Sequence, residues 1–224
     1  MIPGGLLVVV SGTGTGIGKT HFAEALLRAL GQAHPRVTGL KPIETGLGES
    51  TVSDAARLER ASTFHVQHFG YVFAESLSPH LAARHQGEPI LLPVLASQID
   101  AVRREADVTL VELPGGLFTP LSDDQVNADL ARDLRPDITI LVAPDRLGVL
   151  HDLGAATRAA RSLPLQVDAI VLVTPELADP STGQNALELG RVLDIPVVAT
   201  LPRASVEQLA SLPEIIALAA SVSR

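Results

Sequence analysis

A glycine-rich stretch near the N-terminus contains the residues whose types and spacing most clearly suggest a chemical task. It reads Gly12-Thr-Gly-Thr-Gly-Ile-Gly-Lys-Thr20, follows an apolar β-branched run and leads into a helical pattern. Glycines let backbone N–H groups turn toward an anion, and the N-terminus of the following helix favours the same anion. In such a loop Lys19 would reach the β- and γ-phosphates, and the Thr20 hydroxyl would hold Mg²⁺. The stretch predicts a nucleotide-binding loop.

This loop is one residue longer than the usual phosphate loop. The usual spacing places a glycine five residues before Gly18, where this chain has Thr13, and the glycine is Gly12 instead. An ordinary glycine-rich turn is the alternative interpretation. The preceding strand pattern, the following helix pattern and the alternating glycines favour phosphate binding.

Further polar residues lie at the ends of later apolar runs. Lys41 ends one run, and Glu112 ends another just before two glycines. A carboxylate at the tip of an apolar strand is how a second Mg²⁺ ligand is supplied opposite a phosphate loop, often through water. Lys41 could instead be a surface lysine. Asp54 begins a helical pattern, where it or Ser53 could simply be the N-cap.

Two histidine segments are less specific. His80 follows a Ser-Pro turn and has no cysteine or carboxylate nearby at metal-ligand spacing, which favours a structural role. His151 and Asp152 open a helical pattern after an apolar run. That helix N-terminus could bind a carboxylate, or the two residues could be only a polar first turn.

The elements that must position these residues alternate along the chain. Continuous apolar runs of strand length occupy residues 6–11, 37–42, 108–113, 138–143, 169–173 and 197–201. Helical patterns occupy residues 21–30, 53–61, 92–105, 124–134, 148–162, 183–193 and 213–222. Continuous apolar runs are typical of strands covered on both faces. We expect a three-layer α/β/α fold, P-loop NTPase-like, with a mostly parallel central sheet and ligands at the carboxyl ends of its strands.

Composition limits the class of protein. The chain shows no repeat or linker, so we expect one domain over residues 1–224, with a core of aliphatic side chains because aromatic residues make up 3%. The net charge of −8 argues against nucleic acid or an anionic membrane as partner. The lack of cysteine excludes disulfides and thiolate metal sites. Without a long apolar run or a basic N-terminal segment, we expect a cytoplasmic protein.

Taken together, the motifs resemble the dethiobiotin synthetase family. The residues that carry the likeness occur in the family's order and span roughly residues 6–160: the stretch from Gly12 to Thr20, the stretch from Lys41 to Gly46, Ser53-Asp54, Ser78-Pro-His80, Glu112 with Gly115-Gly116, and the stretch from Phe118 to Asp123. The longer phosphate loop is itself a mark of that family. The ordered set is specific, although no single later motif is decisive.

The resemblance implies a ligase that carboxylates 7,8-diaminononanoate with CO₂ and a nucleoside triphosphate, normally ATP, and closes a cyclic urea. The intermediates would be a carbamate and a carbamic–phosphoric anhydride. The cofactor would be Mg²⁺, and the substrate would lie at a homodimer interface. Holding both amines in one bound molecule favours ring closure.

The resemblance also implies roles for residues of this chain. The catalytic group would be Lys41, Lys19 and Thr15, since the lysines neutralise charge that grows in the transition state. Mg²⁺ would be arranged by Thr20, Asp54 and Glu112. Nucleotide contacts would come from Thr13, Gly14, Thr15, Gly16, Ile17, Gly18, Lys19, Thr20, His21, Asp54, Glu112, Gly115, Thr174, Pro202, Arg203 and Ala204. Substrate contacts would come from Thr15, Lys41, Thr45, Gly116 and, in the other subunit, Leu147, Gly148, Val149 and Leu150.

The sequence departs from the family's pattern at several places. Gly16 stands where many relatives have Glu, and His151-Asp152 where they often have Asn-His. Leu113-Pro114 replaces Gly-Ala, so a backbone donor is lost. Thr174-Pro175 replaces Asn-Asp, and an Asn there would read a purine edge. We therefore expect weak selectivity for ATP over other triphosphates.

Two other functions fit the same architecture. A diverged paralogous ligase acting on another amine is favoured by Leu113-Pro114. A partner-regulated ATPase switch of the partitioning class is the second, but that class has an additional lysine where this chain has Gly14. Diamine-dependent turnover distinguishes the synthetase from both of these functions.

Overall fold

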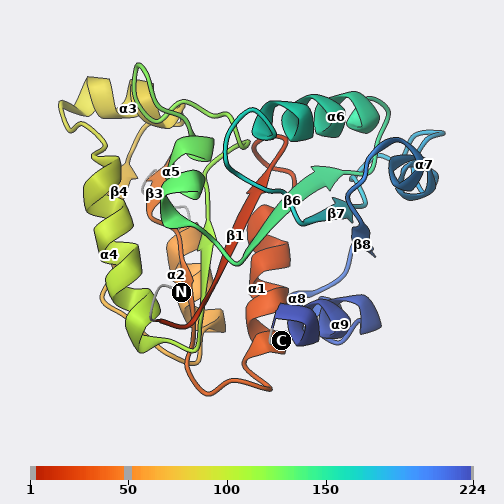
Figure 1. The fold of residues 1–224 in the computed structure, drawn as a ribbon, viewed down its shortest axis with the longest axis horizontal. Helices are drawn as coiled ribbons and strands as arrows, with labels where there is room; N and C mark the ends of the chain where they lie inside the picture. The colour runs from red at the N-terminus through yellow and green to blue at the C-terminus, as the bar shows by residue number, and fades with distance from the viewer. Residues whose placement is uncertain (1–3, 48–51, 223–224) are drawn as a thin grey trace.

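A six-stranded sheet forms the centre of the molecule (Figure 1). The computed structural model describes residues 4–47 and 52–222, and the other residues of the predicted 1–224 domain lie outside the described part. The strand order is β2-β5-β1-β6-β7-β8, and every pairing in this sheet is parallel. The strands are β1 (Leu6–Gly12), β2 (Val37–Leu40), β5 (Val108–Glu112), β6 (Ile138–Pro144), β7 (Ala169–Val173) and β8 (Val197–Leu201). A parallel pair, β3 (Ile43–Thr45) and β4 (Tyr71–Phe73), forms a second small sheet.

Helices cover both faces of the sheet, so the predicted three-layer α/β/α fold is confirmed. One face is covered by α1 (Lys19–Leu30), α2 (Asp54–Ala61), α8 (Val206–Ala210) and α9 (Pro213–Val222). The other is covered by α3 (Pro79–Gln86), α4 (Leu92–Glu105), α5 (Asn127–Leu134), α6 (Val149–Ala160) and α7 (Asn185–Val192). None of the described helices is long and apolar enough to cross a membrane.

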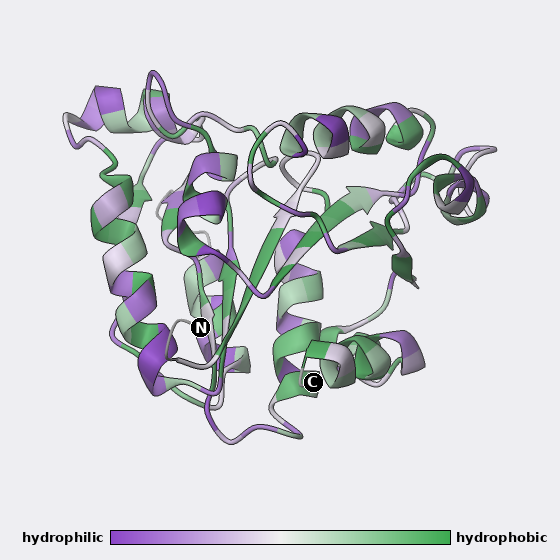
Figure 2. Ribbon diagram, in the orientation of Figure 1, coloured by the Kyte–Doolittle hydropathy of each residue, from purple (hydrophilic) through white to green (hydrophobic). Residues whose placement is uncertain are grey.

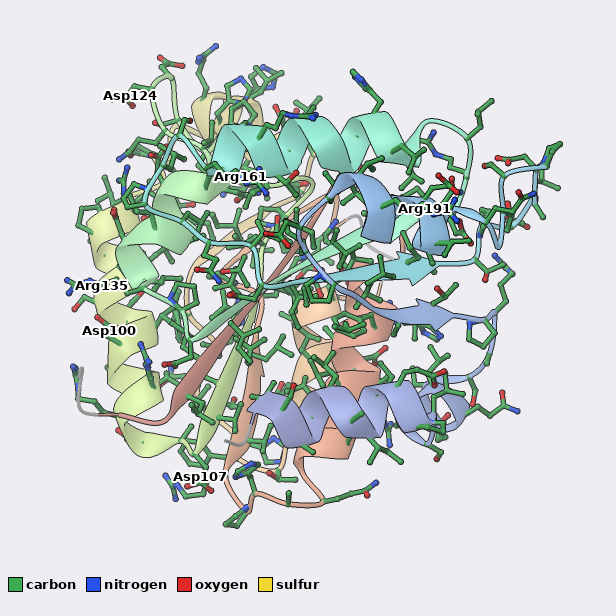
Figure 3. The ribbon with its side chains drawn as sticks, turned by 45° about the vertical axis from the view of Figure 1, so that its right-hand side comes forward. Asp100, Asp107, Asp124, Arg135, Arg161 and Arg191 are labelled. Atoms are coloured by element: carbon green, nitrogen blue, oxygen red, sulfur yellow. The ribbon has the colours of Figure 1, made fainter. Side chains whose placement is uncertain are left out.

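The two faces of β1 explain why the apolar runs are continuous. Leu7 and Val9 pack into one core cluster, whereas Val8 and Val10 pack into the other. All four side chains are fully buried, so burial on both sides stabilises the central strand. Figure 2 shows the apolar strands at the centre, with hydrophilic residues spread over the helices and loops. Charged residues such as Asp124 and Arg191 are exposed on the periphery (Figure 3).

The predicted strands and helices are present, with shorter ends in several places. The run 37–42 stops at Leu40, and the helix expected from 124 begins at Asn127 because Leu121 and Ser122 donate N–H groups to the Gln125 carbonyl in a turn. The helix expected over 183–193 begins at Asn185. The patterns did not predict β3, β4, α3 or α8. These elements have three to eight residues, too few for periodicity to distinguish them from loop.

Candidate active site

The phosphate loop connects the carboxyl end of β1 to the first turn of α1. Gly16 and Gly18 have φ of 70° and 92°, in a backbone region that residues other than glycine rarely adopt. A Cβ on Gly12 would lie 2.8 Å from the Val142 carbonyl oxygen of the neighbouring strand. These glycines let the loop turn back tightly, so that the N-terminus of α1 opens into a cleft.

Lys19 is buried within this loop. Its Nζ donates a hydrogen bond to the Gly14 carbonyl oxygen at 2.6 Å. Burial, and after it the Lys41 charge, lower the pKa of Lys19 from its usual 10.5 to about 8, against the opposing effect of Glu112 and Asp54. A phosphate in the loop would supply the missing negative charge and restore the protonated form.

A second buried cluster joins three elements at the foot of the cleft. The fully buried Glu112, at the tip of β5, accepts hydrogen bonds on Oε1 from the Thr20 hydroxyl at 2.9 Å and from Lys41 Nζ at 2.5 Å. Lys41 Nζ also lies 3.5 Å from Asp54 Oδ2. Lys41 is therefore no surface lysine, and Ser53 rather than Asp54 is the N-cap of α2.

The same cluster offers oxygen donors of the kind that Mg²⁺ prefers. Among the described residues, no group donates a hydrogen bond to the buried Glu112 Oε2. A buried carboxylate oxygen without a partner is costly unless a cation or water satisfies it. Thr20 and Asp54 add a hydroxyl and a second carboxylate nearby. No group of three His, Cys, Asp or Glu in the described ranges could hold a metal ion, so Mg²⁺ would keep waters or phosphate oxygens as its other ligands.

A cleft of about 850 Å³ opens above both lysines. Thr45 lies on its wall, where the pairing of β3 with β4 sets Thr45 opposite Phe73. Other predicted residues that line the cleft are Thr15, Gly16, Ile17, Gly18, Lys19, Thr20, His21, Lys41, Asp54, Glu112 and Gly115. Most of the predicted phosphate, metal and amine contacts thus share one cavity.

The loop after β5 packs against the phosphate loop. Gly116 forms a β-bridge with Thr13, and the Leu117 N–H donates to the Gly12 carbonyl oxygen at 2.9 Å. Gly115 and Pro114 line the cleft, while Gly116 lines a separate groove of about 690 Å³ between the phosphate loop and α6. The groove also contains Thr13 and Gly14.

Segments far apart in the sequence meet on the other side of the phosphate loop. A Cβ on Gly18 would lie 3.1 Å from Val173, the residue before Thr174. The Thr174 N–H donates to the Leu201 carbonyl, which places it beside the loop with Pro202, Arg203 and Ala204. His21 Nε2 lies 2.8 Å from the Ala204 carbonyl oxygen. The structure therefore groups the residues predicted to contact the nucleotide base.

The predicted carboxylate site lies apart from the cleft of its own chain. Leu147 is 75% exposed, and Gly148, with φ of 95°, is the N-cap of α6. Val149 is buried under that helix, and Leu150 is partly exposed. The Leu147 N–H already donates to Asp179 Oδ2 at 2.8 Å. Assignment of these residues to a neighbouring subunit stays a prediction.

The histidine segments take different roles. His80 Nδ1 lies 2.9 Å from the Ser78 hydroxyl at the start of α3, as expected for a structural residue. His151 and Asp152 line the groove beside the phosphate loop, and Asp152 forms an ion pair with Arg146 at 3.2 Å. Both remain on a polar first turn of α6.

Two buried side chains at the cleft received no role from the sequence. Asn127 donates to the carbonyl oxygens of Pro114 and Gly116 at 2.5 and 2.8 Å and so fixes the loop after β5. Glu44 is 6% exposed and accepts hydrogen bonds from the start of α2. For Glu44, the available sequence signal was an acidic residue between Ile43 and Thr45. For Asn127, nothing in the local sequence distinguished it from an ordinary helix residue.

Comparison of the sequence with known proteins finds a family model that covers most of the chain and relatives that share one name. A family model described as an AAA domain matches residues 7–211. The chain is 34% identical to an ATP-dependent dethiobiotin synthetase of Rhodopirellula baltica, over 89% of this chain and 85% of that protein. It is 35% identical to the Caulobacter sp. protein of the same name, over 87% and 86%.

Solved structures match in fold. A ParA family ATPase from Chlorobium tepidum has a TM-score of 0.59 at 14% identity, covering 97% of this chain and 98% of that one. A chain of the MinC:MinD cell division protein complex from Aquifex aeolicus has a TM-score of 0.61 at 11% identity, covering 97% and 95%. At these identities the likeness extends to the fold alone.

Proposed function

The chain belongs to the family of ATP-dependent dethiobiotin synthetases, and from this we propose that its cleft converts 7,8-diaminononanoate, CO₂ and a nucleoside triphosphate into dethiobiotin. The observation that carries the proposal is the buried cluster of Lys41, Glu112 and Thr20 beside Lys19. It brings two ammonium groups, a hydroxyl and carboxylates to one cavity at the carboxyl ends of the strands. Phosphoryl transfer next to a bound amine needs such an arrangement.

The first steps build an activated carbonyl. One amine nitrogen attacks the carbon of CO₂, loses a proton and becomes a carbamate. A carbamate oxygen then attacks the γ-phosphorus, and the bond to the β-phosphate oxygen breaks, which releases the nucleoside diphosphate. Lys41 Nζ is placed to neutralise the carbamate, while Lys19 neutralises the transferring phosphoryl group.

The last step closes the ring. The second amine attacks the carbonyl carbon of the carbamic–phosphoric anhydride and loses a proton, and the carbon–oxygen bond to phosphate breaks. The product is a five-membered cyclic urea and inorganic phosphate. Because both amines belong to one bound molecule, the attack is intramolecular. Thr45, on the cleft wall, would orient an amine through its hydroxyl.

Mg²⁺ fits the residues at the foot of the cleft. Thr20, Glu112 and Asp54 would hold it, and the unpartnered Glu112 Oε2 supports this assignment. Bound there, the ion would withdraw charge from the β- and γ-phosphate oxygens. Lys41, which donates to Glu112 Oε1, would hold that carboxylate in its orientation.

We also propose a homodimer, in which each cleft is completed by the partner. The groove beside the phosphate loop is lined by the exposed Phe118, and the exposed Leu147 and Leu150 are chain neighbours of its lining residues Arg146 and His151. N–H groups at the start of α6 would bind the substrate carboxylate of the neighbouring subunit, while those of Leu147 and Val149 already donate to Asp179 and to the Arg146 carbonyl. Since the reaction consumes nucleoside triphosphate, we place the protein in the cytoplasm.

A subunit-mixing experiment tests the shared site. Lys41→Ala subunits are mixed with Gly148→Pro subunits, each inactive on its own. If the site is shared, mixed dimers contain one cleft with neither substitution, and part of the activity returns. No recovery despite mixed-dimer formation, measured by native mass spectrometry, would contradict a shared site.

Phosphate release by the purified protein tests the reaction itself. With Mg-ATP and bicarbonate, we expect release to depend on 7,8-diaminononanoate and the product to have the mass of dethiobiotin. A diamine whose amines are not adjacent, such as 1,8-diaminooctane, is the control, because it cannot close a five-membered urea. Phosphate release that ignores the diamine would contradict the proposal.

A further inference from the structure

Glu44 is a buried acid at the cleft that the reaction described above does not use. Its carboxylate accepts hydrogen bonds from the Asp54 N–H at 2.5 Å, the Ser53 hydroxyl at 2.8 Å and the Ala55 N–H at 3.4 Å. Among the described residues, no lysine or arginine forms an ion pair with it. Its negative charge is therefore balanced by the start of α2 and not by a cation.

The start of α2 suits this role. The first N–H groups of a helix lack partners within the helix and carry partial positive charge. The Ser53 hydroxyl accepts from the Ala56 N–H at 3.2 Å while donating to Glu44, so one hydroxyl links the cap to the acid. Glu44 thus fixes the end of α2 to β3, the strand that also carries Thr45.

The same contacts determine where Asp54 lies. Its backbone is held by Glu44, its Oδ2 lies 3.5 Å from Lys41 Nζ, and its Oδ1 lies 3.5 Å from Arg57. Arg57 is in turn held by Glu24 at 2.5 Å. Glu44 contacts the backbone N–H of Asp54 and not its carboxylate. The Asp54 carboxylate can therefore face the phosphates and a metal ion.

We propose that Glu44 is a positioning residue for the metal side of the site: it anchors α2 so that Asp54 stays beside Lys41 on the cleft that Glu112 also lines, where a phosphate-bound divalent cation would be held. This inference rests on the proposed function, in which Asp54 is a Mg²⁺ ligand. Groups that orient the ligands of a metal typically change metal affinity by about 10- to 100-fold when removed.

Equilibrium binding of a non-hydrolysable ATP analogue tests the role without turnover. The dissociation constant is measured by calorimetry in EDTA and in saturating Mg²⁺, and the ratio of the two values reports the gain from the metal. We expect Glu44→Ala to reduce this ratio about tenfold while binding in EDTA stays close to that of the unsubstituted protein. Glu44→Gln, which keeps the volume and one acceptor oxygen, should give an intermediate ratio, and it carries the test if the alanine variant does not fold.

Asp168→Asn is the matched control. Asp168 also accepts a backbone N–H, that of Thr139 at 2.8 Å, but at the opposite end of the sheet from the cleft. We expect this variant to lower the thermal unfolding temperature without changing the Mg²⁺ ratio. An equal change of the ratio in Asp168→Asn and Glu44→Ala would mean that Glu44 acts only through general stability, and would overturn the inference.

Asp54→Asn separates the assignment of Asp54 as a metal ligand from the positioning role of Glu44. We expect it to lower the Mg²⁺ ratio, and the double variant with Glu44→Ala to add less than about a further twofold, because both act through one ligand. An effect of Asp54→Asn with none of Glu44→Ala or Glu44→Gln would overturn the positioning role alone. An unchanged ratio in Asp54→Asn would overturn the metal assignment, and the role of Glu44 with it.

Discussion

The phosphate end and the base end of the nucleotide site are built differently. At the phosphate end, Lys19, Lys41 and Glu112 are all less than 8% exposed. The Lys41 side chain donates to Glu112, and the Lys19 side chain donates to the Gly14 carbonyl oxygen. At the base end, Pro202 and Arg203 are exposed, and the loop is contacted through its backbone, by the Thr174 N–H at Leu201 and by His21 at the Ala204 carbonyl oxygen. In the proposed function, buried side chains at the phosphate end would carry out the reaction, and the loop at the base end would contact the base.

This contrast predicts a steep decrease in substitution effects from one end to the other. The two lysines of the chain are Lys19 and Lys41, and all other side-chain cations apart from histidine are arginines. A compact ammonium that can change its protonation state is thus found at the phosphate end alone. Substitutions there should alter catalysis far more than any at the base end.

Lys41→Ala should have the largest effect. We expect turnover to fall by at least about 100-fold, because positive charge facing the carbamate and the transferring phosphoryl group is lost. Binding of the triphosphate should persist, since the phosphate loop is intact, and Glu112 keeps the Thr20 hydroxyl as a partner. Phosphate release and analogue binding are measured on the same preparation.

The control for Lys41→Ala is Arg28→Ala, which removes a cation from an exposed ion pair with Glu207 on the far end of α1. Exposed pairs contribute about 0–1 kcal/mol, so its activity should match that of the unsubstituted protein. A Lys41→Ala protein with normal turnover would remove the proposed mechanism.

Lys19→Ala should be next in size, and should weaken both binding and rate. Its ammonium is buried in the loop that surrounds the phosphates, so we expect triphosphate affinity to fall by about 10-fold or more and kcat to fall as well. Calorimetric titration with the analogue measures the first and phosphate release the second. Normal triphosphate binding by this variant would mean that the loop is not the phosphate site.

The pH dependence of binding should show a smaller effect of the same lysine. The pKa of Lys19 is lowered to about 8, so in the free protein Lys19 is charged below that pH and neutral above it. A bound triphosphate favours the charged form, so binding takes up a proton above pH 8. We expect the dissociation constant to rise by up to about tenfold per pH unit between pH 8 and 9.5, and to be flat near pH 7.

Lys19→Met provides the control for this pH dependence. Without the ammonium, binding should be weaker at all pH values and nearly independent of pH over the same range. A rise of equal slope in Lys19→Met would assign the proton to another group.

The base end should show the smallest changes. We expect ATP, CTP and GTP to support turnover within about a tenfold range, and Thr174→Asn to shift the preference toward ATP by a few-fold, because an amide can pair with a purine edge. Comparison of kcat/KM for the three triphosphates measures both. A strong preference for ATP in the unsubstituted protein, unchanged by Thr174→Asn, would contradict the comparison of the two ends.

That the residues of the phosphate end lie close together could be predicted from the sequence for a physical reason. Glu112 ends β5 and Lys41 directly follows β2, and the carboxyl ends of such parallel strands meet at one edge of the sheet. The loop from Gly12 to Thr20 is local in the chain, so its glycines and its helix start could be recognised without knowledge of the fold.

Two buried residues, Asn127 and Glu44, could not be assigned a role from the sequence. Asn127 donates to the Pro114 carbonyl oxygen and so fixes that loop. This contact depends on where α5 begins, and the sequence pattern predicted a helix from residue 124, where the structure has a turn. Glu44 faces the start of α2 only because β3 pairs with β4, and strands of three residues give no periodic signal. Such contacts follow from tertiary packing and not from residue spacing.

Incorporation of labelled carbon tests the central claim most directly. The protein is incubated with Mg-ATP, ¹³C-bicarbonate and 7,8-diaminononanoate, and the product and phosphate are measured together by mass spectrometry and colorimetry. We predict a dethiobiotin mass carrying one labelled carbon, with one phosphate released for each ring, and neither with Lys41→Ala. Phosphate release without a labelled ring, or a labelled ring formed equally well by Lys41→Ala, would contradict the account.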